Sequence, residues 1–218
     1  PRGSITGTVG ASGAGKTTLA KVIAGFIPQV EGGELTGSAT VDGRNLAELS
    51  LVEAVSKVGL VIQNPFNQIS GARYTVRGEI AFGLENLGTP RDQMAARVDE
   101  VAALLRITDL LDRSPYALSG GQMQRVAIAR ALVNDPAVIL ADEATGNLDT
   151  RTSFEVLVLF QQLHAAGRTI IFVTHNPDIA HYASRNIELR DGRIIRNEVN
   201  DHILSAAEGL AALPDRKS

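Results

Sequence analysis

Short apolar runs recur along this chain and are separated by polar, glycine-containing segments, which is the pattern of buried strands that alternate with helices. Helices are expected after the first run, at Leu19–Ala24, and between two later runs, at Thr152–His164. Strands that are apolar on both faces predict a mainly parallel sheet flanked by helices, an α/β fold. The expected strands are Ser4–Val9, Gly37–Val41, Lys57–Gln63, Ala137–Ala141, Thr169–Val173 and Asn186–Leu189.

Between residues 64 and 134 the pattern changes to helical spacing. Two segments, Thr75–Leu87 and Arg91–Arg106, carry apolar residues three and four positions apart. Pro90 stands where the first turn of a helix tolerates proline. We therefore expect a helical subdomain at 64–134 within a single domain that spans 1–218, and a further helix after Asp201.

Composition narrows the possible functions. The formal net charge is -3 with both signs mixed along the chain, which argues against a dedicated nucleic-acid binder, and there is no cysteine for disulfides or thiolate metal sites. The absence of cysteine fits a reducing cytoplasm. The longest apolar stretch, Val126 to Ala141, contains Arg130, Asn134 and Asp135, so it does not predict a membrane span. Any role at a membrane is expected to come through a partner.

A glycine-rich loop lies between the first expected strand and the first expected helix. The segment Gly10–Thr17 reads GASGAGKT and fits the phosphate-loop pattern G-x-x-x-x-G-K-[ST]. Backbone N–H groups of such a loop surround phosphate oxygens, and the start of the following helix adds positive potential. Lys16 can reach the β- and γ-phosphates, and the Thr17 hydroxyl can bind Mg²⁺. A simple glycine turn before a helix is the alternative.

Two acidic residues follow an apolar strand. Asp142 and Glu143 come directly after Ala137–Ala141, which places them at the carboxyl edge of the expected sheet, where phosphate loops also lie. Asp142 can hold Mg²⁺ and Glu143 can act as the general base toward a water molecule. The alternative is an ordinary acidic turn.

A second helix start with exposed backbone N–H groups is expected about a hundred residues after the first. The segment Leu118–Gln122 reads LSGGQ and precedes the apolar helix Met123–Val133, with Ser119 as its N-cap. A single nucleotide does not need two phosphate-binding helix starts from one compact chain. Two such starts make sense if they meet across an interface between chains. A capped helix after a turn is the alternative.

Taken together, these motifs resemble those of the ABC ATPase family. GASGAGKT resembles its Walker A motif, LSGGQMQRVAIARAL its signature helix, and VILADEATGNLD its Walker B motif and D-loop. The run Val61–Pro65 resembles its Q-loop, and Val173–His175 its switch histidine. The five motifs occur in family order and cover nearly the whole chain.

The resemblance implies a head-to-tail dimer, formed with a second ABC ATPase subunit, that holds two ATP between the phosphate loop of one copy and the signature of the other. It implies transport through a separate transmembrane permease, at the cytoplasmic face of the membrane, with no nucleic acid bound. The implied catalytic residues are Glu143, His175 and Gln63, and the implied Mg²⁺ ligands are Thr17, Gln63 and Asp142. On residue type alone, His175 reads as a structural histidine at a strand end. The implied nucleotide contacts are Gly10, Ala11, Ser12, Gly13, Ala14, Gly15, Lys16, Thr17, Thr18, Ser119, Gly120, Gly121, Gln122 and Asp149.

Three departures from the family pattern stand out. Family members normally carry two strands and an adenine-stacking aromatic residue before the phosphate loop, whereas nine non-aromatic residues precede Gly10. Since base–aromatic stacking contributes about 1–3 kcal/mol, we expect weakened ATP affinity and a domain that lacks these strands. Ala144 and Thr18 stand where many members have Pro and Ser, but neither change removes a catalytic atom.

The third departure is a mixed subfamily pattern. The sequence QNPFNQ and the run from Ile80 to Asn86 are similar to ATPases of energy-coupling-factor and cobalt or vitamin importers. The runs ADEATGNLDTRTS and LRDGRI are similar to ATPases of macrolide-export and lipoprotein-release systems. The importer resemblance is given more weight, because the helical subdomain normally touches the membrane partner.

Two other functions are weighed against transport. An ABC ATPase that acts on DNA or ribosomes would usually carry coiled-coil inserts, a second cassette or basic extensions, and none is visible. A P-loop kinase or GTPase would leave LSGGQ unexplained, and the guanine-reading N-K-x-D of a GTPase is absent.

Overall fold

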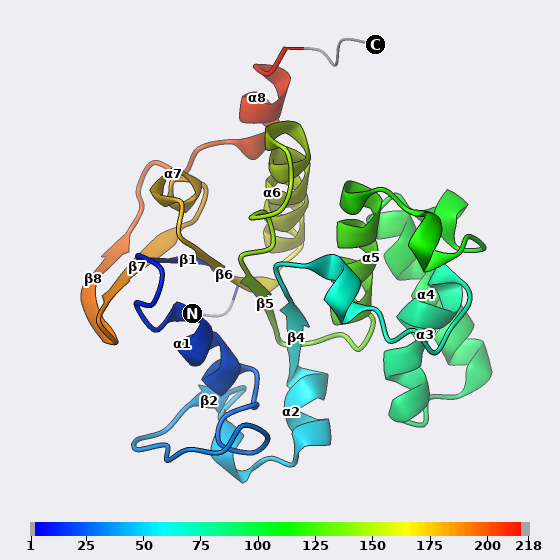
Figure 1. Ribbon diagram of the computed structural model, residues 1–218, viewed down its shortest axis with the longest axis horizontal. Helices are drawn as coiled ribbons and strands as arrows, with labels where there is room; N and C mark the ends of the chain where they lie inside the picture. The colour runs from blue at the N-terminus through cyan, green and yellow to red at the C-terminus, as the bar shows by residue number, and fades with distance from the viewer. Residues whose placement is uncertain (1–2, 215–218) are drawn as a thin grey trace.

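A six-stranded sheet forms the centre of the chain, as the computed structural model shows for residues 3–214 (Figure 1). The strand order is β4-β5-β6-β1-β7-β8; the first five are parallel neighbours, and β8 pairs antiparallel with β7. The mainly parallel α/β sheet predicted from the sequence is confirmed. The strands are β1 (Ile5–Val9), β4 (Val58–Val61), β5 (Val138–Asp142), β6 (Thr169–Thr174), β7 (Arg185–Arg190) and β8 (Arg193–Val199).

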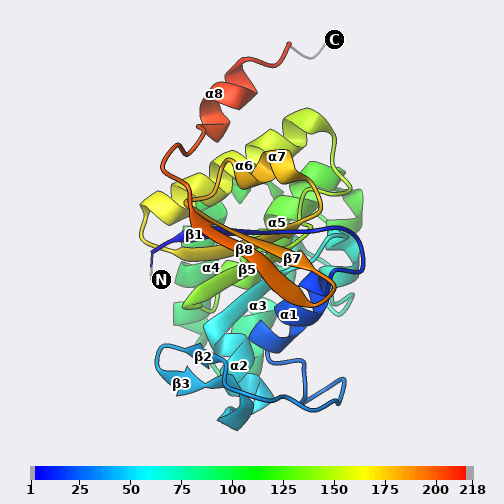
Figure 2. The same cartoon turned by 90° about the vertical axis from the view of Figure 1, so that its left-hand side faces the viewer.

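Helices cover both faces of the sheet, as Figure 2 shows with α6 and α7 on one side and α1 on the other. Neighbouring residues of β5 explain why both faces are covered: Ile139 and Leu140 are fully buried, yet they belong to separate apolar clusters on opposite faces. The larger cluster contains Phe160 and Leu163, and the smaller contains Ala20 and Leu46. The flanking helices are α1 (Lys16–Ile23), α2 (Leu51–Lys57), α6 (Thr150–Ala165), α7 (Pro177–Ala180) and α8 (Ala206–Ala211).

The interval 64–134 is helical, as the sequence pattern predicts, and its described residues contain no strand. Three helices pack together here, and the first is capped by the Thr75 side chain, which accepts a hydrogen bond from the Gly78 N–H at 3.2 Å. That this interval is a subdomain of its own stays a prediction. The helices are α3 (Val76–Asn86), α4 (Arg91–Leu104) and α5 (Gly120–Leu132).

Several local predictions differ from the structure. The expected strand Gly37–Val41 is wrong: only β2 (Thr40–Val41) is extended, and it pairs with β3 (Arg44–Asn45) outside the main sheet. Gly37 has a φ of 90°, in the left-handed region, which is incompatible with a strand. The expected strand Lys57–Gln63 is shorter, because Lys57 ends α2.

The short elements β3 and α7 were not predicted, and neither were α2 and β8. Helix α2 begins with a capping box, in which the Ser50 side chain accepts from the Glu53 N–H and the Glu53 carboxylate accepts from the Ser50 N–H. The edge strand β8 is exposed along its whole length, so it lacks the apolar pattern that identifies the buried strands. Among the described residues, no helix combines the length and the apolar character that a membrane span requires.

We predict that Gly59→Ala destabilises the fold. A β-carbon at this β4 position would lie 2.3 Å from the Ala131 carbonyl oxygen and 3.0 Å from Pro136 Cγ, so backbone must move. We expect a loss of roughly 1–3 kcal/mol in the free energy of unfolding, measured by urea titration. Gly120→Ala is the matched control, because a β-carbon there meets nothing within 4 Å. Equal stability of the two variants would contradict this account of the packing between β4 and α5.

Candidate functional site

The register of three parallel strands brings the predicted site residues to one edge of the sheet. Val9 at the end of β1 lies opposite Thr174 of β6, and Asp142 at the end of β5 lies opposite Val173. The phosphate loop and His175 follow directly after β1 and β6, and Glu143 follows directly after Asp142, which ends β5. They therefore share the carboxyl edge of the sheet, where α/β proteins place their ligands.

The lysine of the glycine-rich loop is buried inside the loop that it belongs to. Lys16 is 5% exposed, and its Nζ donates to the carbonyl oxygens of Gly10 and Ala11, both at 2.9 Å. Gly13 and Gly15 have φ values of 80° and 96°, a left-handed conformation that side chains rarely adopt. Gly15 is the N-cap of α1 and supplies no side-chain acceptor. The first N–H groups of this helix therefore suit an external anion.

The hairpin formed by β7 and β8 also contacts the phosphate loop. A β-carbon at Gly10 would lie 2.4 Å from the Leu189 carbonyl oxygen, so only glycine fits there, and the Gly192 N–H donates to the Ala14 carbonyl at 3.0 Å. The hairpin turns at Asp191 and Gly192, with φ values of 50° and 74°. Sequence reasoning missed this support, although Asp-Gly between two strands is a recognised hairpin signal.

Asp142 has the properties of a Mg²⁺ ligand. Burial is the main influence on its carboxyl and raises its pKa, while a hydrogen bond with Thr17 and the nearby Lys16 act in the opposite direction. Its Oδ1 is buried and has no hydrogen-bond partner. A buried carboxylate oxygen with free lone pairs beside a threonine hydroxyl fits Mg²⁺, which prefers oxygen ligands.

Asp142, Thr17 and Gln63 are the three predicted Mg²⁺ ligands. No group of three His, Cys, Asp or Glu that could hold a metal occurs within residues 3–214. Mg²⁺ in nucleotide sites commonly has one or two protein ligands and takes the rest from phosphates and water. Gln63, the third predicted ligand, is exposed and lies beside Gly146 in the loop after Glu143, where a β-carbon would be 2.8 Å from Gln63 Nε2.

Glu143 and His175 lie in contact at the sheet edge. His175 Nδ1 is 3.2 Å from Glu143 Oε1, and the two side chains are 57% and 23% exposed. Glu143 has a φ of 51°, unusual for a residue with a side chain, and its N–H donates to the Val173 carbonyl at 2.9 Å. The backbone bond holds this strained residue against β6. A carboxylate so placed can accept a proton, and the imidazole can orient it.

The predicted signature residues form the start of α5. Ser119 and Gln122 make a reciprocal capping box: the Ser119 Oγ accepts from the Gln122 N–H at 3.4 Å, and the Gln122 Oε1 accepts from the Ser119 N–H at 3.0 Å. The Gln122 side chain is thus used within its own helix start. Ser119 and Gly120 are exposed, so this helix start lies at the surface.

Asp149 and the signature meet at one threonine of α6. The Asp149 carboxylate accepts from the Thr152 N–H at 3.0 Å and from the Thr152 hydroxyl at 2.6 Å, which caps α6. A β-carbon at Gly121 would lie 2.7 Å from Thr152 Cγ2, so the start of α5 packs closely against this cap. Asp149 and Gly121, both predicted at the nucleotide, therefore meet at Thr152 of α6.

The two glycine-lined helix starts belong to different regions of the sheet. The phosphate loop follows β1, whereas α5 packs on β4, and β1 and β4 are three strand positions apart. Three strand spacings amount to about 14 Å. Of the other predicted contacts, Ala11, Ser12 and Thr18 lie in the phosphate loop and the first turn of α1.

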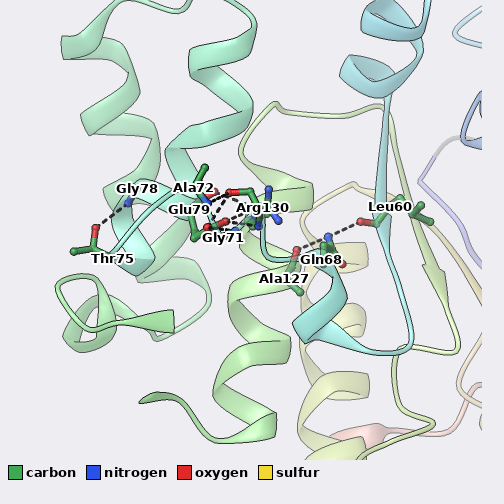
Figure 3. Close-up of polar contacts among 10 residues, drawn as sticks. Leu60, Gln68, Gly71, Ala72, Thr75, Gly78, Glu79, Ala127 and Arg130 are labelled. Atoms are coloured by element: carbon green, nitrogen blue, oxygen red, sulfur yellow. Dashed lines mark hydrogen bonds and ion pairs between the residues drawn. The ribbon is translucent and has the colours of Figure 1, made fainter. Parts of the chain in front are cut away.

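Sequence reasoning also missed a polar network that joins three segments next to the site. Gln68, Glu79 and Arg130 connect the segment after Gln63 with α3 and α5, as Figure 3 shows. Gln68 and Arg130 lie within the quoted runs QNPFNQ and LSGGQMQRVAIARAL, but the sequence gives no sign that they contact one another's segments, which are far apart in the chain.

The chain is similar to known proteins over nearly its whole length. Residues 1–146 match a family model described as ABC transporter. The energy-coupling factor transporter ATP-binding protein EcfA1 of Enterococcus faecalis is 38% identical over 97% of this chain and 74% of its own length. That of Halalkalibacterium halodurans is 42% identical over 89% of this chain and 68% of its own length.

Solved structures agree with these sequence matches. CbiO1 of Clostridium perfringens, described as part of the ABC transporter complex CbiONQ, has a TM-score of 0.80 and 30% identity, covering 97% of this chain and 80% of its own. The dimeric ATP-binding cassette MJ0796, in a post-hydrolysis state with ADP and Pi, has a TM-score of 0.75 and 29% identity, covering 91% of this chain and 86% of its own.

We predict that Asp142→Asn stabilises the protein at neutral pH in the absence of ligands. Because burial raises the folded-state pKa of Asp142, the folded protein binds this proton more tightly than the unfolded chain. The cost of the buried charge is therefore absent below the ordinary pKa of aspartate and complete above the raised folded pKa. The gain in unfolding free energy should appear in urea titrations at pH 7 and vanish toward pH 4. The exposed Asp112→Asn removes the same charge and should give no such gain; a gain as large there would refute the assignment.

Proposed function

This chain belongs to the ABC transporter family, and from that premise we propose that it is the ATP-hydrolysing subunit that dimerises around two ATP and drives transport through a separate transmembrane protein. The observation that carries the proposal is the meeting of the phosphate loop, Asp142–Glu143 and His175 at one sheet edge. The reaction is ATP + H₂O → ADP + phosphate. The family relationship and the ADP and Pi held by the similar cassette MJ0796 both support it.

The phosphate loop binds the triphosphate. Its backbone N–H groups and the start of α1 face the anion, and Lys16 exchanges its two carbonyl partners for phosphate oxygens. Thr17, Asp142 and Gln63 would hold Mg²⁺, which when bound neutralises charge on the β- and γ-phosphates. The remaining loop residues, Gly10 to Gly15 and Thr18, shape this pocket.

Glu143 accepts the proton of the attacking water. Its contact with His175 keeps the carboxylate at the sheet edge, and the exposed imidazole is free to donate toward the γ-phosphate. Gln63, which lies beside the loop that follows Glu143, contacts the same water. Phosphoryl transfer requires that the reacting groups are positioned and that their developing charge is stabilised. Glu143, His175 and Gln63 act in these two ways.

The signature of a second copy completes each site. Ser119, Gly120 and Gly121 present a second helix start, on a helix that packs against β4, whereas the phosphate loop follows β1. A head-to-tail pair of copies would place this helix start on the far side of the nucleotide, with Gln122 and Asp149 supporting it through their caps. The pair is homodimeric or heterodimeric.

We further assign the chain to importer-type transport, as a peripheral subunit at the cytoplasmic face of the membrane. The similar proteins of E. faecalis and H. halodurans are named for energy-coupling factor transporters, and CbiO1 is described as part of a complex with other components. Co-purification of a transmembrane protein tests this assignment. No observation on this chain favours the alternative role on DNA or ribosomes.

We predict that Glu143→Gln abolishes most ATP turnover, by about 10²–10⁴-fold, and retains ATP binding as a trapped dimer. The amide keeps the shape of the side chain but cannot accept a proton. Phosphate release measures turnover, and size-exclusion chromatography with light scattering measures the dimer. Glu100→Gln removes a charge from an exposed carboxylate of α4 and should leave both unchanged. Normal turnover in Glu143→Gln would remove this residue from its proposed role.

Mixing two inactive variants tests the shared site. Lys16→Ala and Ser119→Ala homodimers should each bind little ATP at any site. A mixed dimer contains one site with Lys16 from one copy and Ser119 from the other, and one site that lacks both. We expect binding to recover at about one site per mixed dimer, measured with a fluorescent ATP analogue. If mixing restores nothing while Ser119→Ala alone binds normally, nucleotide is held by one copy and the shared site is wrong.

A further inference from the structure

The hairpin of β7 and β8 contacts the phosphate loop at three positions. The Gly192 N–H donates to the Ala14 carbonyl oxygen at 3.0 Å. A β-carbon at Gly15 would lie 3.4 Å from Gly192 Cα, and one at Gly10 would lie 2.4 Å from the Leu189 carbonyl oxygen. Figure 2 shows the tip of the hairpin beside the start of α1. The backbone of the hairpin tip therefore lies directly against the backbone of the loop.

The hydrogen bond at Ala14 fixes the direction of one peptide group. In a planar trans peptide, the carbonyl of one residue and the N–H of the next point in opposite directions. Because the Ala14 carbonyl points at the hairpin, the Gly15 N–H points away from it, and no hydrogen bond joins this N–H to another group of residues 3–214. Gly15 comes directly before α1, whose first N–H groups also lack partners within the helix. A bond on the outer side of the loop thus sets the direction of a free N–H on its other side.

Lys16 and the hairpin support different parts of the loop. The Lys16 Nζ holds the carbonyl oxygens of Gly10 and Ala11, each at 2.9 Å, whereas the hairpin holds that of Ala14. In the proposed function the Lys16 ammonium exchanges its carbonyl partners for phosphate oxygens, so the first support is lost when nucleotide binds. The Gly192 N–H belongs to backbone outside the loop and keeps its bond to Ala14.

The tip of the hairpin is shaped by a bulge and a tight turn. The register between β7 and β8 shifts between Glu188 and Leu189, which marks a bulge. Bulges bend a strand pair and increase its twist. Asp191 and Gly192 then close a two-residue turn with φ values of 50° and 74°, as in a type I′ turn. The position of the Gly192 N–H is therefore set by backbone geometry.

The chain contains a second Asp-Gly hairpin that serves as an internal comparison. Asp42 and Gly43 join β2 to β3 with φ values of 51° and 75°, nearly the same as those of Asp191 and Gly192. A β-carbon at either glycine would meet nothing within 4 Å. Asp42 lines a cavity together with Pro136, which precedes β5, so this turn lies at the amino edge of the sheet, away from the phosphate loop. The same substitution in the two turns imposes the same backbone strain.

We propose that Gly192 is a positioning residue for the reaction: by holding the Ala14 carbonyl, its N–H aims the Gly15 N–H at the phosphates of the bound nucleotide. This rests on the proposed function, in which the loop binds the triphosphate. The Gly15 N–H forms the same hydrogen bond to phosphate before and during the reaction. Loss of that bond weakens the ground state and the transition state alike, which raises KM and leaves kcat unchanged.

The first test compares Gly192→Ala with Gly43→Ala. Both place a side chain in the same left-handed conformation, so urea titrations should show an equal loss of stability. We expect Gly192→Ala to raise the KM for ATP about tenfold with kcat within about twofold, while Gly43→Ala changes neither. Partial unfolding would lower kcat at an unchanged KM, so the two effects are separable.

A second variant removes only the hydrogen-bond donor. The chain has no cysteine, so synthetic residues 183–218 can be joined at Ala183 through a temporary cysteine that is then desulfurised. Glycolic acid in place of Gly192 exchanges the N–H for an ester oxygen. The control is the same exchange at Gly209, whose N–H donates to the Ser205 carbonyl at 3.1 Å at the start of α8. We expect the ester at 192 to weaken ATP and pyrophosphate by the same factor of about ten, and the ester at 209 to weaken neither.

Two results would overturn the inference. One is an ester variant at 192 that binds ATP and pyrophosphate as tightly as the unmodified chain made by the same synthesis. The other is an equal rise of KM in Gly192→Ala and Gly43→Ala, which would make the effect one of general strain. An unmodified chain that binds no ATP would instead refute the proposed function, and this inference with it.

Discussion

The parallel pairing of β5, β6 and β1 is the constraint on which the rest of the molecule depends. Parallel strands end at the same edge, so the backbone register alone decides that Asp142, Thr174 and Val9 finish side by side. Each of the loops that follow then needs only a short path to reach a common point. Burial of both sheet faces fixes this register, since a slip of one residue would exchange Ile139 and Leu140 between two different cores.

Local sequence signals were sufficient for most of the sheet and for the motif-bearing helix starts. The strands β1, β5, β6 and β7 are apolar runs with clear borders, and Ser119 is a residue type that caps helices, so each could be predicted without tertiary information. The prediction at Gly37–Val41 failed because alternation of residue types does not reveal a left-handed glycine. Strand β8 was missed because an exposed edge strand has no buried face to mark it.

The network around Gln68 and Glu79 could not have been predicted for a different reason. A glutamine in a short turn and a glutamate in the first turn of a helix are both ordinary surface residues by sequence. Only the packing of α3 against α5, and of α5 against β4, turns them into partners of distant backbone groups. The site residues are identified by motifs of adjacent residues, whereas the contacts within this network are assembled by the fold.

The carbonyl contacts of Lys16 have a consequence for the loop that they hold. An ammonium that bonds to the carbonyl oxygens of Gly10 and Ala11 acts as an internal template and keeps the surrounding backbone curved around it. The entropic cost of ordering that loop is then met during folding, not at the moment of ligand capture. When ATP binds, the Lys16 ammonium exchanges carbonyl oxygens for phosphate oxygens. The rate of ATP binding should therefore depend on a loop that is already formed, more than on ordering of the loop by the nucleotide.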